Sequence, residues 1–216
     1  MRDAIVDAVA TANREWLLWG GHAWNVRHEF AGLAQKDKDD DEARARYILN
    51  TYCPAAEATP TVEDIQKDEF AWSAVFMSYV FKASGFEKAE FPFSVSHSTW
   101  IRRAVKAQRG KEHFRFHAHR ISDPLARPRV GDLIAYARPD KDGEKLTFDD
   151  AQTWFDRRSN YKSHSDLVVA EGPQEIQVIG GNVKDSVLKK VIPLNTSGLI
   201  ADRSFSWFAV LRYQGS

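Results

Sequence analysis

Hydrophobic residues in the first half of the chain recur at the spacing of amphipathic helices. Residues 4–19 carry them three or four positions apart, and Gly20-Gly21 ends the segment. A second helix is predicted over 43–52, after a run of charges that we interpret as a solvated turn. Residues 71–83 are hydrophobic on almost every side, which is typical of a helix in the centre of a domain.

The pattern changes to alternation in the second half of the chain. Polar and apolar residues alternate over 113–119, which predicts a strand. The polar stretch 139–162 is interpreted as a long insertion. Further strands are expected within 129–136, 166–170, 176–179, 187–192 and 206–213. Helices followed by strands predict an α+β domain in which N-terminal helices pack on a central antiparallel sheet.

Composition narrows the classes of function. The 216 residues are 43% hydrophobic, which is enough for a sizeable core in one domain or in one domain with a decorated end. Lys and Arg together number 30, as do Asp and Glu, so a net charge of zero gives no electrostatic argument for binding nucleic acid or an anionic membrane. The short basic clusters Arg102-Arg103 and Arg157-Arg158 are interpreted as solvated faces. The single cysteine, Cys53, rules out an internal disulfide framework.

The first residues carry charge and lack the apolar segment of a signal peptide, so none is expected. No apolar run approaches the roughly 20 residues that a membrane-spanning helix needs. We therefore expect a soluble protein.

Three residues that are distant in the sequence have the chemistry of an acyl-transfer site. Ser73 lies near the start of the central helix, His164 opens a strand, and Asn182 follows Gly180-Gly181. Acyl transfer needs a nucleophile, a general base and a group that fixes the tautomer of the base. At a helix N-terminus, the helix dipole and unpaired backbone N–H groups face the reacting carbonyl.

Four short motifs carry a resemblance to a known family. In chain order they are WSAVFMSYV at 72–80, VGDLI at 130–134, HSDLVV at 164–169 and GGN at 180–182. They resemble the nucleophile helix, a conserved turn, the general-base strand and the orienter segment of the NlpC/P60 and CHAP branch of papain-like peptidases. With His97 included, the set is more similar to an uncharacterised bacterial subfamily that has Trp-Ser-Ala in place of Trp-Cys-Ala. The resemblance covers residues 60–195.

This resemblance implies a papain-like α+β fold, with 61–213 as the hydrolase domain and 1–60 as an N-terminal helical extension packed on it. It implies that Ser73 is the nucleophile, His164 the general base and Asn182 the orienter of His164. The substrate-binding residues that it implies are Trp72, His97 and Asp166.

The family acts on amide bonds, often in the peptide stems of bacterial peptidoglycan. For a member without a signal peptide, the resemblance implies an antibacterial effector. Such a protein is made in the bacterial cytoplasm and is delivered by a secretion machine to the periplasm of a target cell. An immunity protein would then be a further partner. No cofactor and no metal are expected.

The sequence leaves several alternatives open. Ser73 stands where the family has a cysteine, so it is a serine nucleophile driven by His164, an engineered Cys→Ser replacement, or part of a catalytically silent ligand-binding module. Cys53 is a competing nucleophile because it can open a helix, where a thiol pKa falls. A metal-dependent hydrolase is a further alternative, since His117 and His119 share one face of the predicted strand.

Overall fold

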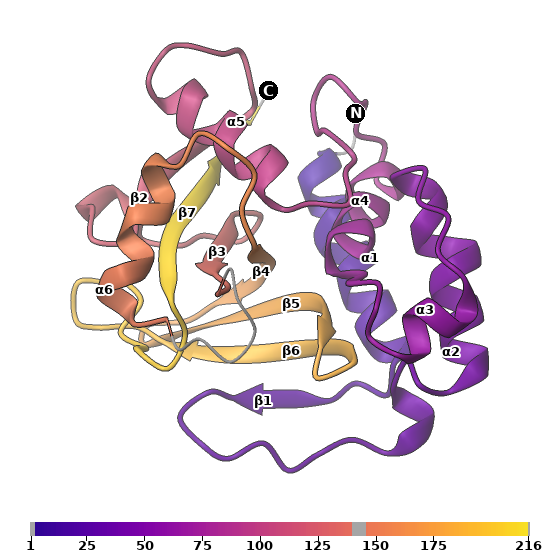
Figure 1. Cartoon of the computed structure of the whole chain (residues 1–216). Helices are drawn as coiled ribbons and strands as arrows, with labels where there is room; N and C mark the ends of the chain where they lie inside the picture. Colours follow the sequence, from indigo (N-terminus) through magenta and orange to yellow (C-terminus); the bar gives the residue numbers. More distant parts are fainter. Residues whose placement is uncertain (1–2, 140–145, 216) are drawn as a thin grey trace.

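A seven-stranded mixed sheet forms the centre of the protein in the computed structural model, which describes residues 3–139 and 146–215 (Figure 1). The strand order is β1-β6-β5-β4-β3-β7-β2. The strands are β1 (Ala23–Asn25), β2 (Phe116–Arg120), β3 (Leu133–Ala137), β4 (Ser163–Glu171), β5 (Glu175–Val183), β6 (Ser186–Pro193) and β7 (Trp207–Tyr213). The short β1 pairs with β6 in parallel, and every other neighbouring pair is antiparallel.

Most helices lie on one side of this sheet, where α1, α2, α3 and α4 form a layer at the right of Figure 1. Helix α4 packs on β4 and β5, and α5 packs on β2. A π-helical segment, Ile48–Tyr52, follows α2. The α-helices of the described residues are α1 (Ala4–Leu18), α2 (Glu42–Tyr47), α3 (Val62–Gln66), α4 (Ser73–Ala83), α5 (Ser98–Gln108) and α6 (Phe148–Ala151).

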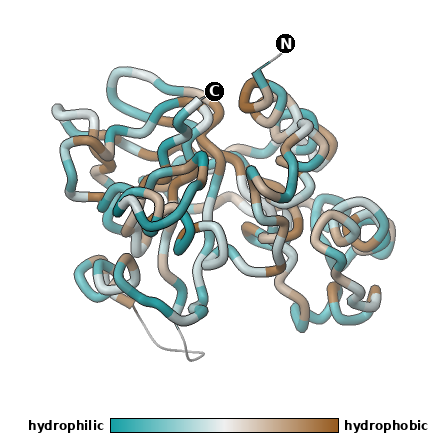
Figure 2. The backbone as a smooth tube through the Cα atoms, turned by 90° about the horizontal axis from the view of Figure 1, so that it is seen from above, coloured by the Kyte–Doolittle hydropathy of each residue, from teal (hydrophilic) through white to brown (hydrophobic). Residues whose placement is uncertain are grey.

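The core has two parts, one on each face of the sheet. The larger part lies between the helical layer and the sheet, where Figure 2 shows hydrophobic segments gathered. The smaller part covers the opposite face and includes Ile134, Tyr136, Val168 and Trp207. Successive side chains of a strand point to opposite faces, and for this reason β3 and β4 contribute to both parts.

The N-terminal segment shares its core with α4. The Trp19 ring stacks on Trp72 at 5.3 Å, and Tyr52 stacks on the same indole at 6.0 Å. The buried carboxylate of Glu15 accepts the Tyr52 hydroxyl at 2.8 Å. These contacts fix the start of α4 from the N-terminal side; the domain boundary at residue 60 stays a prediction.

Several local predictions are confirmed. The chain is α+β, and α4 ends at Ala83, with Ser84 as its C-cap and Gly85 following with φ of 88°. The expected antiparallel sheet is in fact mixed, because β1 pairs with β6 in parallel. The sequence pattern predicts no strand in the segment that forms β1. The expected insertion at 139–162 contains α6 and a 3₁₀ segment, and Trp154 and Phe155 are buried; its residues 140–145 lie outside the described residues.

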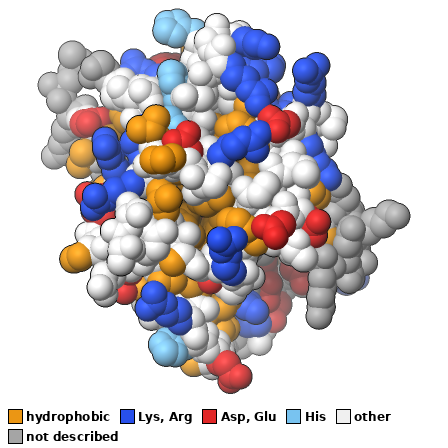
Figure 3. All heavy atoms as spheres, turned by 90° about the vertical axis from the view of Figure 1, so that its left-hand side faces the viewer, with side chains coloured by type: hydrophobic (Ala, Val, Ile, Leu, Met, Phe, Trp, Pro, Cys, Tyr) orange, Lys and Arg blue, Asp and Glu red, His pale blue; other side chains and the backbone are white. Residues whose placement is uncertain are grey.

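The surface mixes charges of both signs. On the face shown in Figure 3, Lys and Arg side chains surround exposed hydrophobic ones, with acidic groups among them. No helix of the described residues is long and apolar enough to cross a membrane.

Candidate active site

Ser73 is the first residue of α4 and lies on the wall of a pocket of about 650 Å³. Its side chain is buried, with 5% of the residue exposed. The preceding residue, Trp72, is held by a 2.6 Å hydrogen bond from its indole N–H to Asp39 Oδ2. No side chain of the described residues caps the N-terminus of α4, so the first backbone N–H groups of the helix have no side-chain partner there.

His97 is the hydrogen-bond partner of Ser73, with Nε2 2.9 Å from the Ser73 Oγ. Both residues line the same pocket. The loop that carries His97 is tied to α4, because the Ser78 hydroxyl donates to the Ser94 carbonyl and accepts the Ser94 N–H, both at 3.0 Å. Helix α4 therefore positions both members of the pair.

The other ring nitrogen of His97, Nδ1, lies 2.9 Å from Ser165 Oγ on β4. That oxygen also accepts the Trp100 indole N–H at 3.1 Å. A hydroxyl can accept two hydrogen bonds, so Nδ1–H can donate to Ser165 while Nε2 accepts the Ser73 proton. In the opposite tautomer the Ser165 hydroxyl donates to Nδ1, and Nε2–H donates to Ser73. The first tautomer is the one that a general base requires.

The pKa of His97 is lowered well below its usual value by burial and by the neighbouring His164. The imidazole is therefore neutral at pH 7, the protonation state in which it can take a proton from a hydroxyl.

His164 belongs to a second buried network. Its Nε2 lies 3.0 Å from Asp166 Oδ1, and its ring stacks on Tyr136 with centroids 4.8 Å apart. Asp166 Oδ2 lies 2.7 Å from Lys190 Nζ, and all three residues of this Lys190–Asp166–His164 network are fully buried. The ammonium group also lies 4.9 Å from the Tyr136 ring centroid and 5.1 Å from that of Phe205.

Burial lowers the pKa of His164 to about 4, against the opposing effect of Asp166. For Asp166, burial would raise the pKa, but the charge of Lys190 and the contacts with His164 lower it to about 2. At neutral pH the network therefore consists of a neutral imidazole beside a carboxylate–ammonium pair.

Strand alternation explains why Ser73 pairs with His97 and not with His164. Ser165 and Leu167 lie on the face of β4 toward the helices, whereas His164 and Asp166 share the face of Tyr136. In the described residues no hydrogen bond joins His164 to Ser73. The His97 and His164 rings are nevertheless neighbours, with centroids 4.8 Å apart.

The predicted orienter, Asn182, is not placed against His164. It has φ of 51° at a register shift of the β5–β6 hairpin, and within the described part of the chain it makes no hydrogen bond to the imidazole. Gly180 faces the imidazole instead: a Cβ there would overlap Asp166 Oδ1 and lie 2.8 Å from His164 Nε2. The missing side chain leaves room for Asp166, which holds His164 in the role predicted for Asn182.

The remaining predicted residues fall outside the pair. Trp72 is buried beside Asp39 and does not line the pocket, and Asp166 is enclosed, so neither is open to a substrate. Burial raises the pKa of Cys53 to about 11, which leaves the thiol protonated and opposes a role as nucleophile. His117 and His119 lie on β2 but are not part of a cluster of three metal-binding groups among the described residues.

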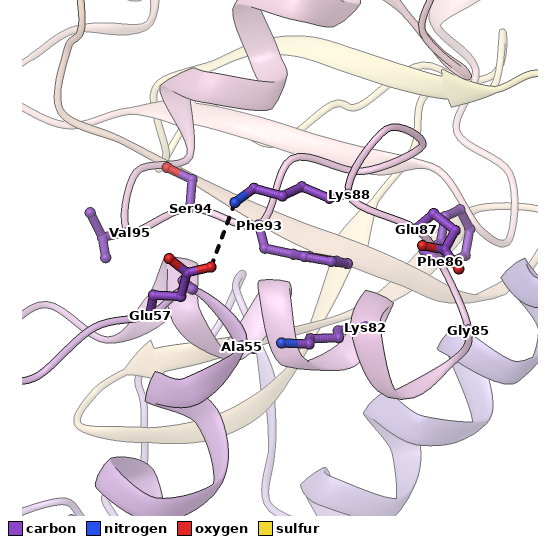
Figure 4. A pocket seen from close by; sticks show the side chains of 11 residues that line it. Ala55, Glu57, Lys82, Gly85, Phe86, Glu87, Lys88, Phe93, Ser94 and Val95 are labelled. Atoms are coloured by element: carbon purple, nitrogen blue, oxygen red, sulfur yellow. Dashed lines mark ion pairs between the residues drawn. The ribbon is translucent and has the colours of Figure 1, made fainter.

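A second pocket of about 660 Å³ lies beside the first (Figure 4). Val95, which is 53% exposed, lines both pockets. In the second pocket Lys82 Nζ lies 5.7 Å from the Phe93 ring centroid, and an ion pair joins Glu57 to Lys88 at 3.6 Å.

Sequence reasoning missed several residues of the site. Ser165 alternates with His164 along a predicted strand and could have been assigned to the helix-facing side. Lys190 lies two positions from both Leu188 and Ile192, which are buried. Because side chains two apart on a strand share a face, this spacing indicates that Lys190 is buried as well. Arg138 and Lys162, which line the pocket, had no sequence signal.

Fold and site together define an α+β protein with a buried serine–histidine pair at the start of a central helix. The chain belongs to DUF2272, a family described as an uncharacterized protein conserved in bacteria, whose model matches residues 38–213. No curated protein and no solved structure matches the chain.

Proposed function

We propose that this protein hydrolyses amide bonds, with Ser73 as the nucleophile and His97 as the general base. The observation that carries the proposal is the 2.9 Å hydrogen bond between the two side chains at the uncapped start of α4, in a pocket. This assignment gives His97 the role that the resemblance implied for His164.

In the proposed reaction, the Ser73 Oγ attacks the carbonyl carbon while His97 Nε2 takes the hydroxyl proton. Backbone N–H groups in the first turn of α4 stabilise the oxyanion, helped by the helix dipole. The protonated His97 then gives its proton to the leaving amine. A water molecule, activated by His97 in the same way, hydrolyses the acyl-enzyme and restores the Ser73 hydroxyl.

The Lys190–Asp166–His164 network packs beside the His97 ring, with the His97 and His164 centroids 4.8 Å apart. Its neutral imidazole packs beside His97 without adding a charge, since Asp166 is paired with Lys190. We infer that the fold is a variant of the papain-like NlpC/P60 architecture. Support comes from the packing of α4, which carries the nucleophile, on β4 and β5.

The proposed substrates are peptide stems of bacterial peptidoglycan, as the resemblance implies. Arg138 and Lys162 line the Ser73 pocket and can attract the carboxylates of such peptides. A longer stem can pass Val95 into the second pocket. We also propose that the protein acts as an antibacterial effector in the periplasm of a target cell, where an immunity protein would oppose it.

The test is incubation of purified peptidoglycan with the wild type and with Ser73→Ala and His97→Ala variants, followed by mass spectrometry of the released fragments. We expect release by the wild type and a loss of about 1000-fold or more in either variant. Ser96→Ala is the matched control, because Ser96 lines the same pocket and bonds to Ser98 instead of the pair. Equal release by the wild type and Ser73→Ala would refute the proposal.

A catalytically silent binding module is the second candidate, favoured by the hydroxyl at Ser73 where the resembling family has a thiol. It predicts that peptidoglycan binds without release of fragments. It also predicts that Ser73→Cys gains hydrolytic activity, since a thiol is intrinsically the better nucleophile at neutral pH.

A further inference from the structure

Arg102 and the Arg157-Arg158 pair meet at one pocket although they lie more than fifty positions apart in the sequence. A cavity of about 420 Å³ lies between residues 102–111, which include most of α5 and the residues after it, and residues 155–158. Its lining has six cationic side chains and one carboxylate, that of Asp156. The cations are Arg102, Lys106, Arg109, Lys111, Arg157 and Arg158. Arg158 is exposed and Arg102 and Arg157 are half-buried, so these side chains keep contact with solvent while they line one cavity.

The arrangement is held by specific contacts. The Arg102 guanidinium donates to the Arg158 carbonyl at 2.7 Å and to the Ser98 carbonyl at 3.3 Å, which ties α5 to the 155–158 segment. Arg109 pairs with Asp156 at 2.5 Å, and the same carboxylate also pairs with Arg120. The single carboxylate is thus shared between two arginines.

Much of the positive charge has no acidic partner. Within residues 3–139 and 146–215, no carboxylate lies within ion-pair distance of Arg102, Lys111 or Arg158. Lys106 lies 3.8 Å from Glu112, which is itself engaged by Arg103. In a chain of zero net charge, this is a local concentration of cations around a concave surface.

The helix dipole does not account for the cluster. The C-terminus of α5 carries about half a negative charge, which favours Lys106 in the last turn and Arg109 at the C-cap. The helix dipole does not explain the further cations that the 155–158 segment contributes. Half a charge is also small against the excess of cations in the lining, so the pocket stays attractive to an anion.

We propose that this pocket binds the phosphate groups of a small soluble ligand. Arginine guanidinium groups bind phosphate oxygens with two parallel hydrogen bonds. The cavity is large enough for a small compound with several phosphates, and its concave shape fits such a compound better than a flat membrane surface. This site is separate from Ser73 and does not depend on the proposed hydrolase activity.

The test is calorimetric titration of the full chain with pyrophosphate at low ionic strength. An Arg158→Gln/Lys111→Gln variant removes two cations that have no ion-pair partner in the described residues. Loss of two charge-assisted contacts is expected to weaken binding by about 100-fold. The control, Arg27→Gln/Lys67→Gln, removes the same charge elsewhere and should change the affinity by less than about threefold. Thermal unfolding of both variants checks that they fold.

A second arm separates the sources of phosphate. Vesicles of phosphatidylcholine with phosphatidic acid are sedimented with the wild type and with the pocket variant. Pyrophosphate binding that the pocket variant loses and the control keeps supports the proposal. Equal weakening in both variants, no pyrophosphate binding by the wild type, or binding to vesicles alone would each overturn it.

Discussion

Replacement of Lys190 by methionine tests the buried ion pair beneath the site. The substitution keeps most of the side-chain volume but removes the ammonium group that lies 2.7 Å from Asp166. Both groups are fully buried, so the carboxylate is left without its compensating charge. Breaking a buried pair in this way costs about 3–5 kcal/mol of unfolding free energy. The neighbouring Lys189→Met is the matched control.

Lys189 points to the other side of β6 and is partly exposed, where it donates to Asn13 at 3.2 Å and lies over the Trp16 ring. We expect its replacement to cost about 1 kcal/mol. The assay is urea unfolding of both variants and the wild type at pH 7 and pH 5.

The destabilisation by Lys190→Met should also depend on pH, in a direction that the pKa of Asp166 determines. In the wild type the folded pKa of Asp166 is about 2, below its unfolded value of 3.8, so this carboxyl stabilises the fold above pH 4 and loses that contribution as the pH falls toward 2. Without Lys190 the folded pKa rises above the unfolded one. Lys190→Met should then be more destabilised at pH 7 than at pH 5. The ion pair would be refuted if Lys190→Met lost no more unfolding free energy than Lys189→Met and if that loss were the same at pH 7 and pH 5.

Three further predictions concern the same site. Gly180→Ala should cost about 1–3 kcal/mol because its Cβ overlaps Asp166, whereas Gly172→Ala, whose nearest neighbour would be 3.4 Å away, should be nearly neutral in urea unfolding. The kcat/KM for a stem peptide should stay level as the pH falls from 8 to 6, because the pKa of His97 is lowered well below its usual value; a fall centred near pH 6.5 would contradict this. Val95→Asp should raise KM several-fold and leave kcat unchanged if a substrate spans both pockets, and Val130→Asp, which lines neither pocket, should leave both constants unchanged.

Features set by neighbouring residues could be predicted from the sequence. Thr61 and Asp64 form a capping box at the spacing Thr-x-x-Asp, and Gly85, with a positive φ, follows the C-cap of α4. These depend on contacts within one turn, which a sequence pattern records directly.

Features set by distant residues could not be predicted in the same way. The pairing of β1 with β6 joins segments more than 160 positions apart, and no sequence pattern in Ala23–Asn25 predicts it. Ser73 lies at a helix start, as the sequence pattern predicts, but its partner depends on how the loop of residues 94–97 packs over α4. Motif order along the chain favoured His164, and only the face of β4 on which each side chain lies separates the two histidines.

The measurement that tests the Ser73–His97 pair most directly is covalent labelling with a fluorophosphonate, which reacts with serine hydroxyls activated by a base. We expect intact-mass and peptide mapping to place one adduct on Ser73 in the wild type. The adduct should be lost in His97→Gln and kept in His164→Gln, whose amide can still bond to Asp166. Labelling that survives in His97→Gln but disappears in His164→Gln, or an adduct on another serine, would contradict the assignment.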